Sequence, residues 1–179
     1  MTSRDLTENV EQLQIKRSLE LLRGRAIAVV TRLAHMAATY SDLVMTGRSH
    51  NVAAQATTLG KRFASAADEM LVAIDRVDHL IDTFPLRGIK GPMGTSQDML
   101  DLLDGNEAKL RDMERGIAEH LGFSTVLDSV GQIYPRSLDY DVLTALVQLG
   151  AAPASLATTI RLMACLLYTS PSPRDQRGS

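Results

Sequence analysis

The sequence has no tryptophan, and only 4% of its residues are aromatic. Sandwiches and barrels build their strands from β-branched and aromatic residues, whereas this chain fills its apolar positions with alanine, leucine and methionine, which favour helices. Its single cysteine, Cys165, excludes a disulfide within the chain and a zinc site made of several cysteines. The formal net charge of -2 provides no basic surface for nucleic acid. These scarcities favour a helical protein that does not bind nucleic acid.

Hydrophobic residues make up 45% of the 179 positions, which is enough for one domain with a real core. Residues 2–11 are polar and acidic, and they do not resemble a signal peptide. We therefore expect a cytoplasmic protein.

A seven-residue repeat of apolar side chains predicts a first long helix from Leu6 to about Met45. The apolar residues recur in alternating steps of four and three: Ile15, Leu19, Leu22, Ala26, Val29, Leu33, Met36, Tyr40 and Leu43. Such a seam packs against neighbouring helices, knobs into holes. A helix of roughly 40 residues is about 60 Å long, which exceeds most globular helices. The fold class is therefore predicted to be all-α, an elongated bundle of long helices.

The same pattern predicts a second long helix from about Thr57 to Thr83, ending before Pro85. Its seam consists of Phe63, Ala67, Met70, Ile74, Val77 and Ile81. A glycine-rich connection follows at residues 88–94. Thr95 and Asp98 then stand three apart before an apolar run, which resembles a capping box. Free amides at such a helix start could hold an anion, although a tight turn with an ordinary cap explains the same residues.

Two further helical patterns follow. A shorter one runs from about Asn106 to Leu121 and ends at Gly122, and residues 124–136 after it are irregular. The last runs from Leu138 to about Met163 and is interrupted at Gly150 and Pro153. This last pattern is apolar enough for a membrane span, but its polar residues favour a helix buried on most sides in an oligomeric bundle. Those residues include Gln148, four Ser or Thr residues and Arg161.

One histidine, His50, lies in the polar interruption between the first two helices. Imidazole groups titrate near physiological pH, so a histidine held in a loop by rigid helices is suited to proton transfer. The other histidines, His35, His79 and His120, lie inside helical patterns, where a structural or surface role is the simpler interpretation. None of them has the spacing of a metal site.

Several polar residues have two interpretations from the sequence alone. The hydroxyls of Ser3, Ser49, Thr57 and Thr58 are typical of helix caps. Gln132 and Arg136 could bind a carboxylate or phosphate, or they could satisfy loop carbonyls. The residues by themselves therefore lead to a long-helix bundle with one histidine placed for proton transfer.

Five segments, in order, resemble the adenylosuccinate lyases of the fumarase/aspartase superfamily. The histidine-bearing motif is GRSH at 47–50 with QATTLGKR at 55–62. The next blocks are RGIKGPMGT at 87–95, GQIYPRSLD at 131–139 and IRLMA at 160–164, and TSRD at 2–5 resembles the block that opens the first long helix. The resemblance covers residues 2–164. Argininosuccinate lyase is the nearest rival within the superfamily.

This resemblance implies a β-elimination that splits adenylosuccinate into AMP and fumarate, and the succinylated carboxamide ribotide of purine biosynthesis into its carboxamide product and fumarate. His50 matches the family's general acid. Thr2, Ser3, Ser49 and Gln132 match positions that hold the carboxylates and the phosphate-bearing part of the substrate. Neutral hydroxyls and amides can stabilise the developing negative charge without titrating. No metal and no cofactor is implied, and the family forms homotetramers whose active sites combine several subunits.

The chain departs from the family pattern at both ends. The family's base is a serine in a loop with a Ser-Ser-x-Met-Pro-x-Lys-like signature, which does not occur here. We therefore expect a fragment, with residues 1–164 as part of the central helical domain of a lyase, that has little or no activity alone. Residues 165–179 lack periodicity and are rich in proline, serine and charge, so we expect a disordered tail. The tail resembles translated vector or adapter sequence.

A helical scaffold or adaptor without catalysis is the competing class, because apolar seams and a low aromatic content would suffice for it. A lyase needs His50, Ser49 and the Gln132 loop near one region of the bundle, in some cases across subunits. A scaffold has no reason to bring them together.

Overall fold

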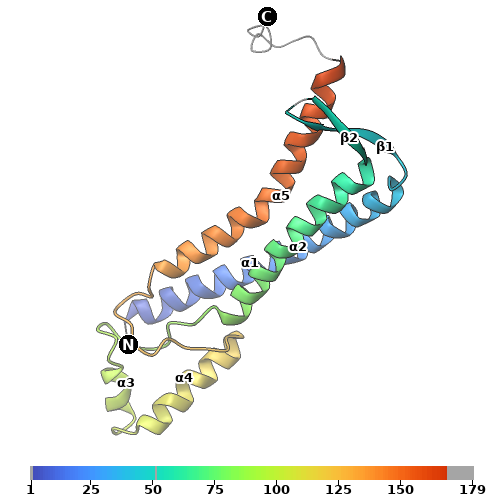
Figure 1. The fold of residues 1–179 in the computed structure, drawn as a ribbon. Coiled ribbons are helices and arrows are strands. Elements are labelled where there is room, and N and C mark those ends of the chain that lie inside the picture. Colours follow the sequence, from blue (N-terminus) through green and yellow to red (C-terminus); the bar gives the residue numbers. More distant parts are fainter. Residues whose placement is uncertain (1, 51, 169–179) are drawn as a thin grey trace, which may run out of the picture. The chain divides into compact units, whose positions relative to one another are not determined.

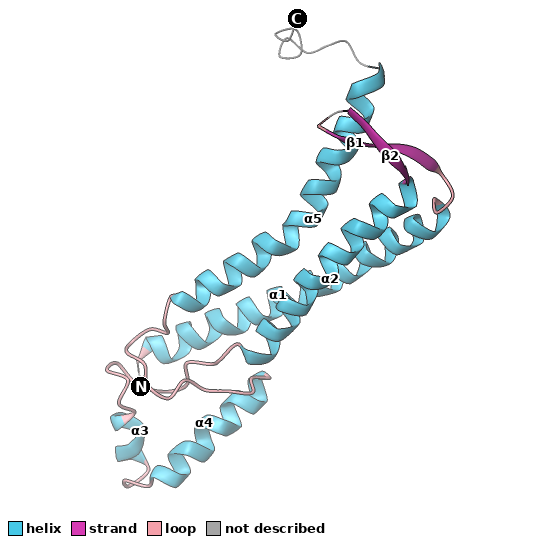
Figure 2. Ribbon diagram, in the orientation of Figure 1, coloured by secondary structure: helices cyan, strands magenta, loops and turns pink. Residues whose placement is uncertain are grey.

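The computed structural model describes residues 2–50 and 52–168, which form five helices and one hairpin (Figure 1). The elements are α1 (Ser3–Thr39), β1 (Val44–Ser49), β2 (Val52–Thr58), α2 (Leu59–Thr83), α3 (Gln97–Leu102), α4 (Glu107–Leu121) and α5 (Ser137–Tyr168). Figure 2 shows that helices dominate and that loops, apart from the hairpin, connect them. The predicted fold class, a protein of long helices, is confirmed.

The chain divides into two compact units. One comprises Met1–Ala28 and Val72–Val147 and is called the loop unit below, because it holds the long connections around α3 and α4. The other comprises Val29–Leu71 and Gln148–Ser179 and is called the hairpin unit. The three long helices each contribute one part to each unit, and the units are described separately.

The core of the loop unit combines apolar residues with a buried polar stripe on α1. The buried apolar side chains include Leu19, Val77, Leu80, Phe84, Leu86, Phe123, Tyr134 and Ala145. The polar stripe comprises Asp5, Glu8, Asn9, Gln12 and Lys16. Its steps of three and four continue the spacing of Leu19 and Ala26, so one face of α1 is polar at its start and apolar further on. A polar face is stable inside a protein only when its groups are hydrogen-bonded.

Ion pairs also link the helices of the loop unit. The guanidinium of Arg23 on α1 donates two hydrogen bonds to the carboxylate of Asp78 on α2. Arg76 on α2 donates to the Asp141 carboxylate at 3.1 Å and to the Thr144 hydroxyl at 2.7 Å, both on α5. Because these pairs are partly exposed, they fix the helices in register more than they stabilise the fold.

In the hairpin unit, α1 ends earlier than the sequence pattern predicts. The helix stops at Thr39 and not near Met45, and the chain turns back so that the Gly60 amide donates to the Tyr40 carbonyl at 2.8 Å. A β-carbon at Gly60 would overlap the carbonyl oxygen of Ala37, so glycine allows the two helix ends to approach. The Thr58 hydroxyl accepts from the Lys61 amide at 3.1 Å, which confirms a cap at the start of α2.

Three other sequence predictions need correction. The polar interruption around His50 is a β-hairpin and not an irregular loop. The capping box at Thr95 and Asp98 is absent: α3 begins after Ser96, whose backbone is left-handed and whose side chain makes no cap hydrogen bond to α3. Its hydroxyl donates to the Ile89 carbonyl at 3.2 Å instead.

The predicted break at Gly150 and Pro153 is also wrong, because α5 continues through both residues. A proline inside a helix lacks the amide that would bond to the carbonyl four residues before it, so the Leu149 carbonyl loses its partner on the helix ladder. Helix α4 agrees with the sequence. Its start is capped by Asn106, whose side chain accepts from the Lys109 amide at 3.0 Å, and it ends at Gly122 with φ 79°.

Residues 137–164 of α5 are long and apolar enough to cross a membrane, by length and composition alone. Only 11% of its apolar window is buried within this chain. Burial of this helix in an oligomeric bundle, as the sequence predicts, is not tested by a single chain and stays a prediction. The backbone of residues 165–168 continues α5 and so belongs to the helix, whereas the predicted disordered tail otherwise lies outside the described residues.

Candidate functional site

His50 stands at the tip of the β1–β2 hairpin. The strands pair antiparallel with Ser49 opposite Val52, so His50 and Asn51 are the two residues between them. The His50 backbone has φ 50°, a left-handed conformation that histidine adopts more readily than most residues. Its side chain and that of Ser49 are exposed. The hairpin therefore exposes a hydroxyl and an imidazole from two consecutive residues.

A bulge shifts the register within this hairpin. Gly47 pairs with Gln55, while Arg48 pairs with Ala53, so β2 holds one extra residue at this point. A β-carbon at Gly47 would come within 2.9 Å of the Gln55 carbonyl oxygen. Bulges bend the strand and redirect the side chains beyond them, which here are those of Ser49 and His50.

Thr2 and Ser3 lie at the start of α1, in the loop unit. The Thr2 amide donates to Asp5 Oδ2 at 2.8 Å, and the Asp5 amide donates to the Thr2 carbonyl at 3.0 Å. Ser3 is exposed and Thr2 is half-buried. The Asp5 carboxylate therefore fixes the backbone at this helix start while the hydroxyls of residues 2 and 3 remain available for other contacts.

Two amide side chains on α1 bind the backbone of the segment that follows α2. Asn9 Nδ2 donates to the Gly88 carbonyl at 2.9 Å, and Asn9 Oδ1 accepts from the Gly88 amide at 2.9 Å. Gln12 in the same way donates to the Pro85 carbonyl at 2.9 Å and accepts from the Arg87 amide at 2.7 Å. Each amide satisfies both a donor and an acceptor of an irregular segment, as a neighbouring strand would.

The side chain of Arg87 is completely buried and joins three parts of the chain. Its Nη1 donates to Asp5 Oδ1 at 2.8 Å and to the Gly88 carbonyl at 3.2 Å. Its Nη2 donates to the carbonyls of Gly91 at 2.8 Å and Gly131 at 3.0 Å. Only the planar, five-donor guanidinium can serve so many acceptors at once.

Burial by itself raises the pKa of the Asp5 carboxyl, but hydrogen bonds from the Thr2 amide, the Arg87 guanidinium and the Gly91 amide outweigh it, so the pKa lies below the ordinary 3.8. The Gly91 amide donates to Asp5 Oδ1 at 2.9 Å. Asp5 is thus an anion at neutral pH, and it neutralises the buried Arg87.

Gln132 is exposed and follows Gly131, whose carbonyl Arg87 binds. On its other side the Tyr134 amide donates to Glu8 Oε2 at 3.2 Å. The Tyr134 ring is buried and its hydroxyl donates to Asp139 at 2.7 Å, so burial and this carboxylate raise the pKa of the phenol. The guanidinium of Arg136 lies over the ring, 4.3 Å from its centroid. Gln132 thus lies between two anchored residues, Gly131 and Tyr134, while its own side chain is exposed.

The predicted site residues fall into two groups, and each group belongs to a different unit of the chain. Thr2, Ser3 and Gln132 belong to the loop unit, and a chain of hydrogen bonds through Asp5 and Arg87 joins the backbone of Thr2 to that of Gly131. Ser49 and His50 belong to the hairpin unit. The substrate-binding and catalytic roles of these residues remain predictions.

Sequence analysis missed the residues that hold this arrangement together. Asp5 and Arg87 fall within the TSRD and RGIKGPMGT blocks, but the sequence assigns them no role, and Glu8, Asn9 and Gln12 lie in no motif. A signal was available, since the four on α1 extend the apolar seam at the same spacing toward the helix start.

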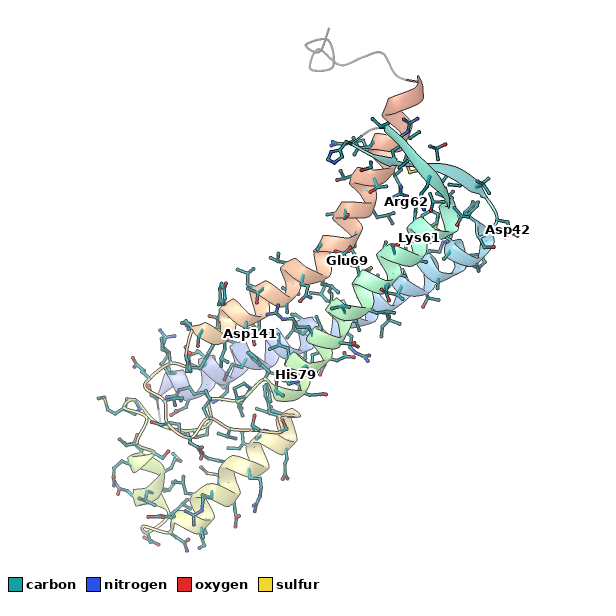
Figure 3. The ribbon with its side chains drawn as sticks, in the orientation of Figure 1. Asp42, Lys61, Arg62, Glu69, His79 and Asp141 are labelled. Carbon is teal, nitrogen blue, oxygen red and sulfur yellow. The ribbon has the colours of Figure 1, made fainter. Side chains whose placement is uncertain are left out.

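Within the described residues, no group of three or more His, Cys, Asp or Glu side chains could hold a metal ion. In the hairpin unit, α2 and α5 enclose a pocket of about 150 Å³ whose polar lining includes Arg62, Glu69, Ser155 and Thr159. Figure 3 labels Arg62 and Glu69 along α2, with Lys61 beside Arg62. The pocket is small, and Arg62 alone of the TTLGKR residues lines it.

Comparison with known proteins identifies the class. The model of the lyase family matches residues 1–161 of this chain, and the chain belongs to that family. Its fold is similar to the crystal structure of a fumarate lyase from Mesorhizobium sp. BNC1, with a TM-score of 0.72 and 21% sequence identity over 92% of this chain and 37% of that one.

Among curated relatives, this chain is similar to the adenylosuccinate lyases of Saccharomyces cerevisiae, at 35% identity over 99% of the chain, and of Schizosaccharomyces pombe, at 33% over 92%. The archaeal adenylosuccinate lyase of Archaeoglobus fulgidus is 31% identical over 90% of the chain. The chain spans about a third of the length of these relatives, 37%, 34% and 35% respectively.

Proposed function

We propose that this chain is the central part of an adenylosuccinate lyase, which releases fumarate from adenylosuccinate to give AMP and from the succinylated carboxamide ribotide of purine biosynthesis. The observation that carries the proposal is the similarity to adenylosuccinate lyases from two yeasts and an archaeon over at least 90% of the chain. The exposed side chains of Ser3, Ser49, His50 and Gln132 are compatible with it.

In this reaction a base removes a proton from the carbon next to a carboxylate, and the negative charge develops on that carboxylate. The carbon–nitrogen bond then breaks, its electron pair goes to the departing nitrogen, and the carbon–carbon double bond of fumarate forms. Thr2, Ser3, Ser49 and Gln132 would donate hydrogen bonds to the carboxylates and the phosphate. His50 would protonate the nitrogen. No metal or cofactor is required by these steps.

The complete protein is proposed to be a cytoplasmic homotetramer, and assembly would cover the exposed apolar side chains of the long helices. On α5 of the loop unit, Tyr140, Leu143 and Val147 are 70%, 58% and 68% exposed and share one face by their spacing. Contiguous apolar faces of this kind are typical of protein–protein interfaces. Assembly would also let Ser49 and His50 of one subunit meet Gln132 of another subunit.

The test begins with the gene, resequenced across both ends of this segment, so that the complete coding frame can be expressed. The purified product is mixed with adenylosuccinate, and fumarate release is measured. His50→Ala is expected to lower kcat by about 10²–10⁴ with little change in KM, since it removes a general acid. His79→Ala is the matched control, because His79 is an exposed helical histidine.

Three outcomes would contradict the proposal. Turnover of argininosuccinate in place of adenylosuccinate would make the chain another lyase of the superfamily. Absence of fumarate from either substrate would favour a scaffold. Equal losses in His50→Ala and His79→Ala would remove His50 from the chemistry. The 179-residue chain is assayed in parallel, and rapid turnover by it would contradict the expected dependence on further segments and subunits.

A further inference from the structure

We propose that the buried Asp5–Arg87 pair is a positioning device that aligns the backbone of Gln132 with the start of α1, and that substrate affinity depends on it. This inference rests on the proposed function, because it takes Gln132 as a substrate-binding residue. Asp5 and Arg87 do not reach the surface and would not touch the substrate. They act through the backbone of the residues that do.

The first argument is the set of contacts that Arg87 makes. One guanidinium binds the carbonyls of Gly91 and Gly131, which belong to two different connections, at 2.8 and 3.0 Å. An isolated β-bridge pairs Leu86 with Val126, but residues 88–94 and 130–134 lie outside it, so their position depends on tertiary hydrogen bonds such as these. The same guanidinium binds Asp5 on α1, so both connections are held in place relative to this helix.

The second argument is that Asp5 serves both sides of this arrangement. Oδ1 accepts from Arg87 and from the Gly91 amide, and Oδ2 accepts from the Thr2 amide. A displacement of the carboxylate would therefore move the backbone of Thr2 and of Gly91 together. Side chains at most 1% exposed are held in one rotamer by their surroundings, which is the rigidity that a binding site needs.

The third argument concerns the free energy of burying an ion pair. An ion pair removed from water gains little net stability compared with apolar residues of the same size. Apolar residues at positions 5 and 87 could fill the volume, but they could not bind the carbonyls of Gly91 and Gly131. The pair therefore supplies a fixed loop geometry that hydrophobic packing would not provide.

The experiment uses the complete enzyme and the variants Arg87→Lys and Asp5→Asn. Lysine keeps the positive charge but cannot span the same acceptors, and asparagine keeps the shape but loses the charge. Both are expected to raise KM for adenylosuccinate about tenfold, the effect of about one lost hydrogen bond, while kcat changes less than about twofold. Arg23→Gln is the control, because it breaks a partly exposed ion pair of the same unit that contacts neither connection.

A double-mutant cycle with Gln132→Ala separates positioning from simple destabilisation. If Arg87 acts through Gln132, the double variant Arg87→Lys/Gln132→Ala has nearly the KM of Gln132→Ala alone. Increases in the logarithm of KM that simply add in the double variant would overturn the proposal. So would a lowered melting temperature in Arg87→Lys with a KM no higher than that of Arg23→Gln.

A second measurement does not depend on the substrate. It tests the positioning role of Arg87 even if the unsubstituted enzyme has another activity. Hydrogen–deuterium exchange in residues 88–94 and 130–134 is expected to be faster in Arg87→Lys than in Arg23→Gln, with residues 107–121 unchanged. Equal exchange in both variants would overturn the positioning role. Failure to split adenylosuccinate, with the expected exchange, would overturn only the proposed function.

Discussion

The carbonyl oxygen of Val130 lies against the α-carbon of Gly94, so closely that a β-carbon at residue 94 would overlap it. Gly94 also has φ 77°, which disfavours any other residue. The connection after α2 and the connection before α5 therefore meet at one point where only glycine fits. Two residues later in the second connection comes Gln132, so this contact bears on the candidate site.

Gly94→Ala is expected to lower the free energy of unfolding by more than about 2 kcal/mol, because both the overlap and the left-handed backbone oppose the side chain. Urea denaturation of the purified protein measures this. Gly116→Ala is the control, since Gly116 is helical and a β-carbon there would have no neighbouring atom within 4 Å; this variant should gain about 0.5–1 kcal/mol. Equal stability of the two variants would mean that the connections do not meet as described.

The Asp5 carboxylate predicts a specific loss of stability in acid. A pKa that is lower in the folded than in the unfolded protein adds stability that is fully present above the unfolded value, near 3.8, and is lost as the pH falls through the lower folded value. Urea midpoints measured from pH 7 down to pH 2 should therefore show a nearly constant difference between the unsubstituted protein and Asp5→Asn above about pH 5. The difference should shrink below pH 3.8. A difference that stays constant through acid would contradict the ion pair.

Pro153→Ala should stabilise α5. The proline lies inside the helix, its side chain is exposed, and alanine would restore the hydrogen bond to the Leu149 carbonyl. The expected gain in the free energy of unfolding is about 1–3 kcal/mol, measured by thermal or urea denaturation. Ala157→Gly, at an exposed position of the same helix, should instead cost about 1 kcal/mol. A destabilised Pro153→Ala would show that proline serves a contact outside this chain.

Charged substitutions on the exposed face of α5 test the proposed tetramer. Leu143→Arg or Val147→Arg should dissociate the complete protein into smaller species, because a buried unpaired charge in an interface is costly. Analytical ultracentrifugation measures the change. Ala108→Arg, at an exposed position of α4, should leave the assembly unchanged. An intact tetramer in Leu143→Arg would place the interface elsewhere.

Sequence patterns predicted the long helices well because burial along them repeats every three to four residues. Leu19, Ala26 and Leu33 of the predicted seam are buried, but Leu22 and Val29 between them are exposed. The predicted spacing of apolar residues is therefore correct, but these residues do not form a single buried face. One apolar row of α1 packs within the chain, and a second row stays exposed. Periodicity identifies apolar rows but does not say which neighbour covers each.

The hairpin was missed for a different reason. Strands are recognised by alternation between a buried and an exposed face, yet no residue of β1 or β2 is buried, and only Met45 and Gly47 of β1 alternate as half-buried positions. The sequence between the two strands, His-Asn, is also not the usual Asn-Gly pair. Likewise the buried Asp5 and Arg87 are 82 residues apart, and only the tertiary fold brings such a pair together.

Most hydrogen bonds from the polar stripe of α1 to neighbouring segments go to main-chain atoms, the carbonyls or amides of residues 85, 87, 88, 91, 122 and 134. The exceptions are the side-chain pairs Asp5–Arg87 and Glu8–Arg136. Side chains projecting from those segments, such as exposed Met93 and Gln132, take no part in these contacts. Their identity can therefore drift over evolution without displacing the main chain that carries them. One helix surface could in this way support lyases with different substrate preferences: laboratory diversification at residues 92, 93 and 132 should leave the fold stable, while changes at 132 should alter substrate binding.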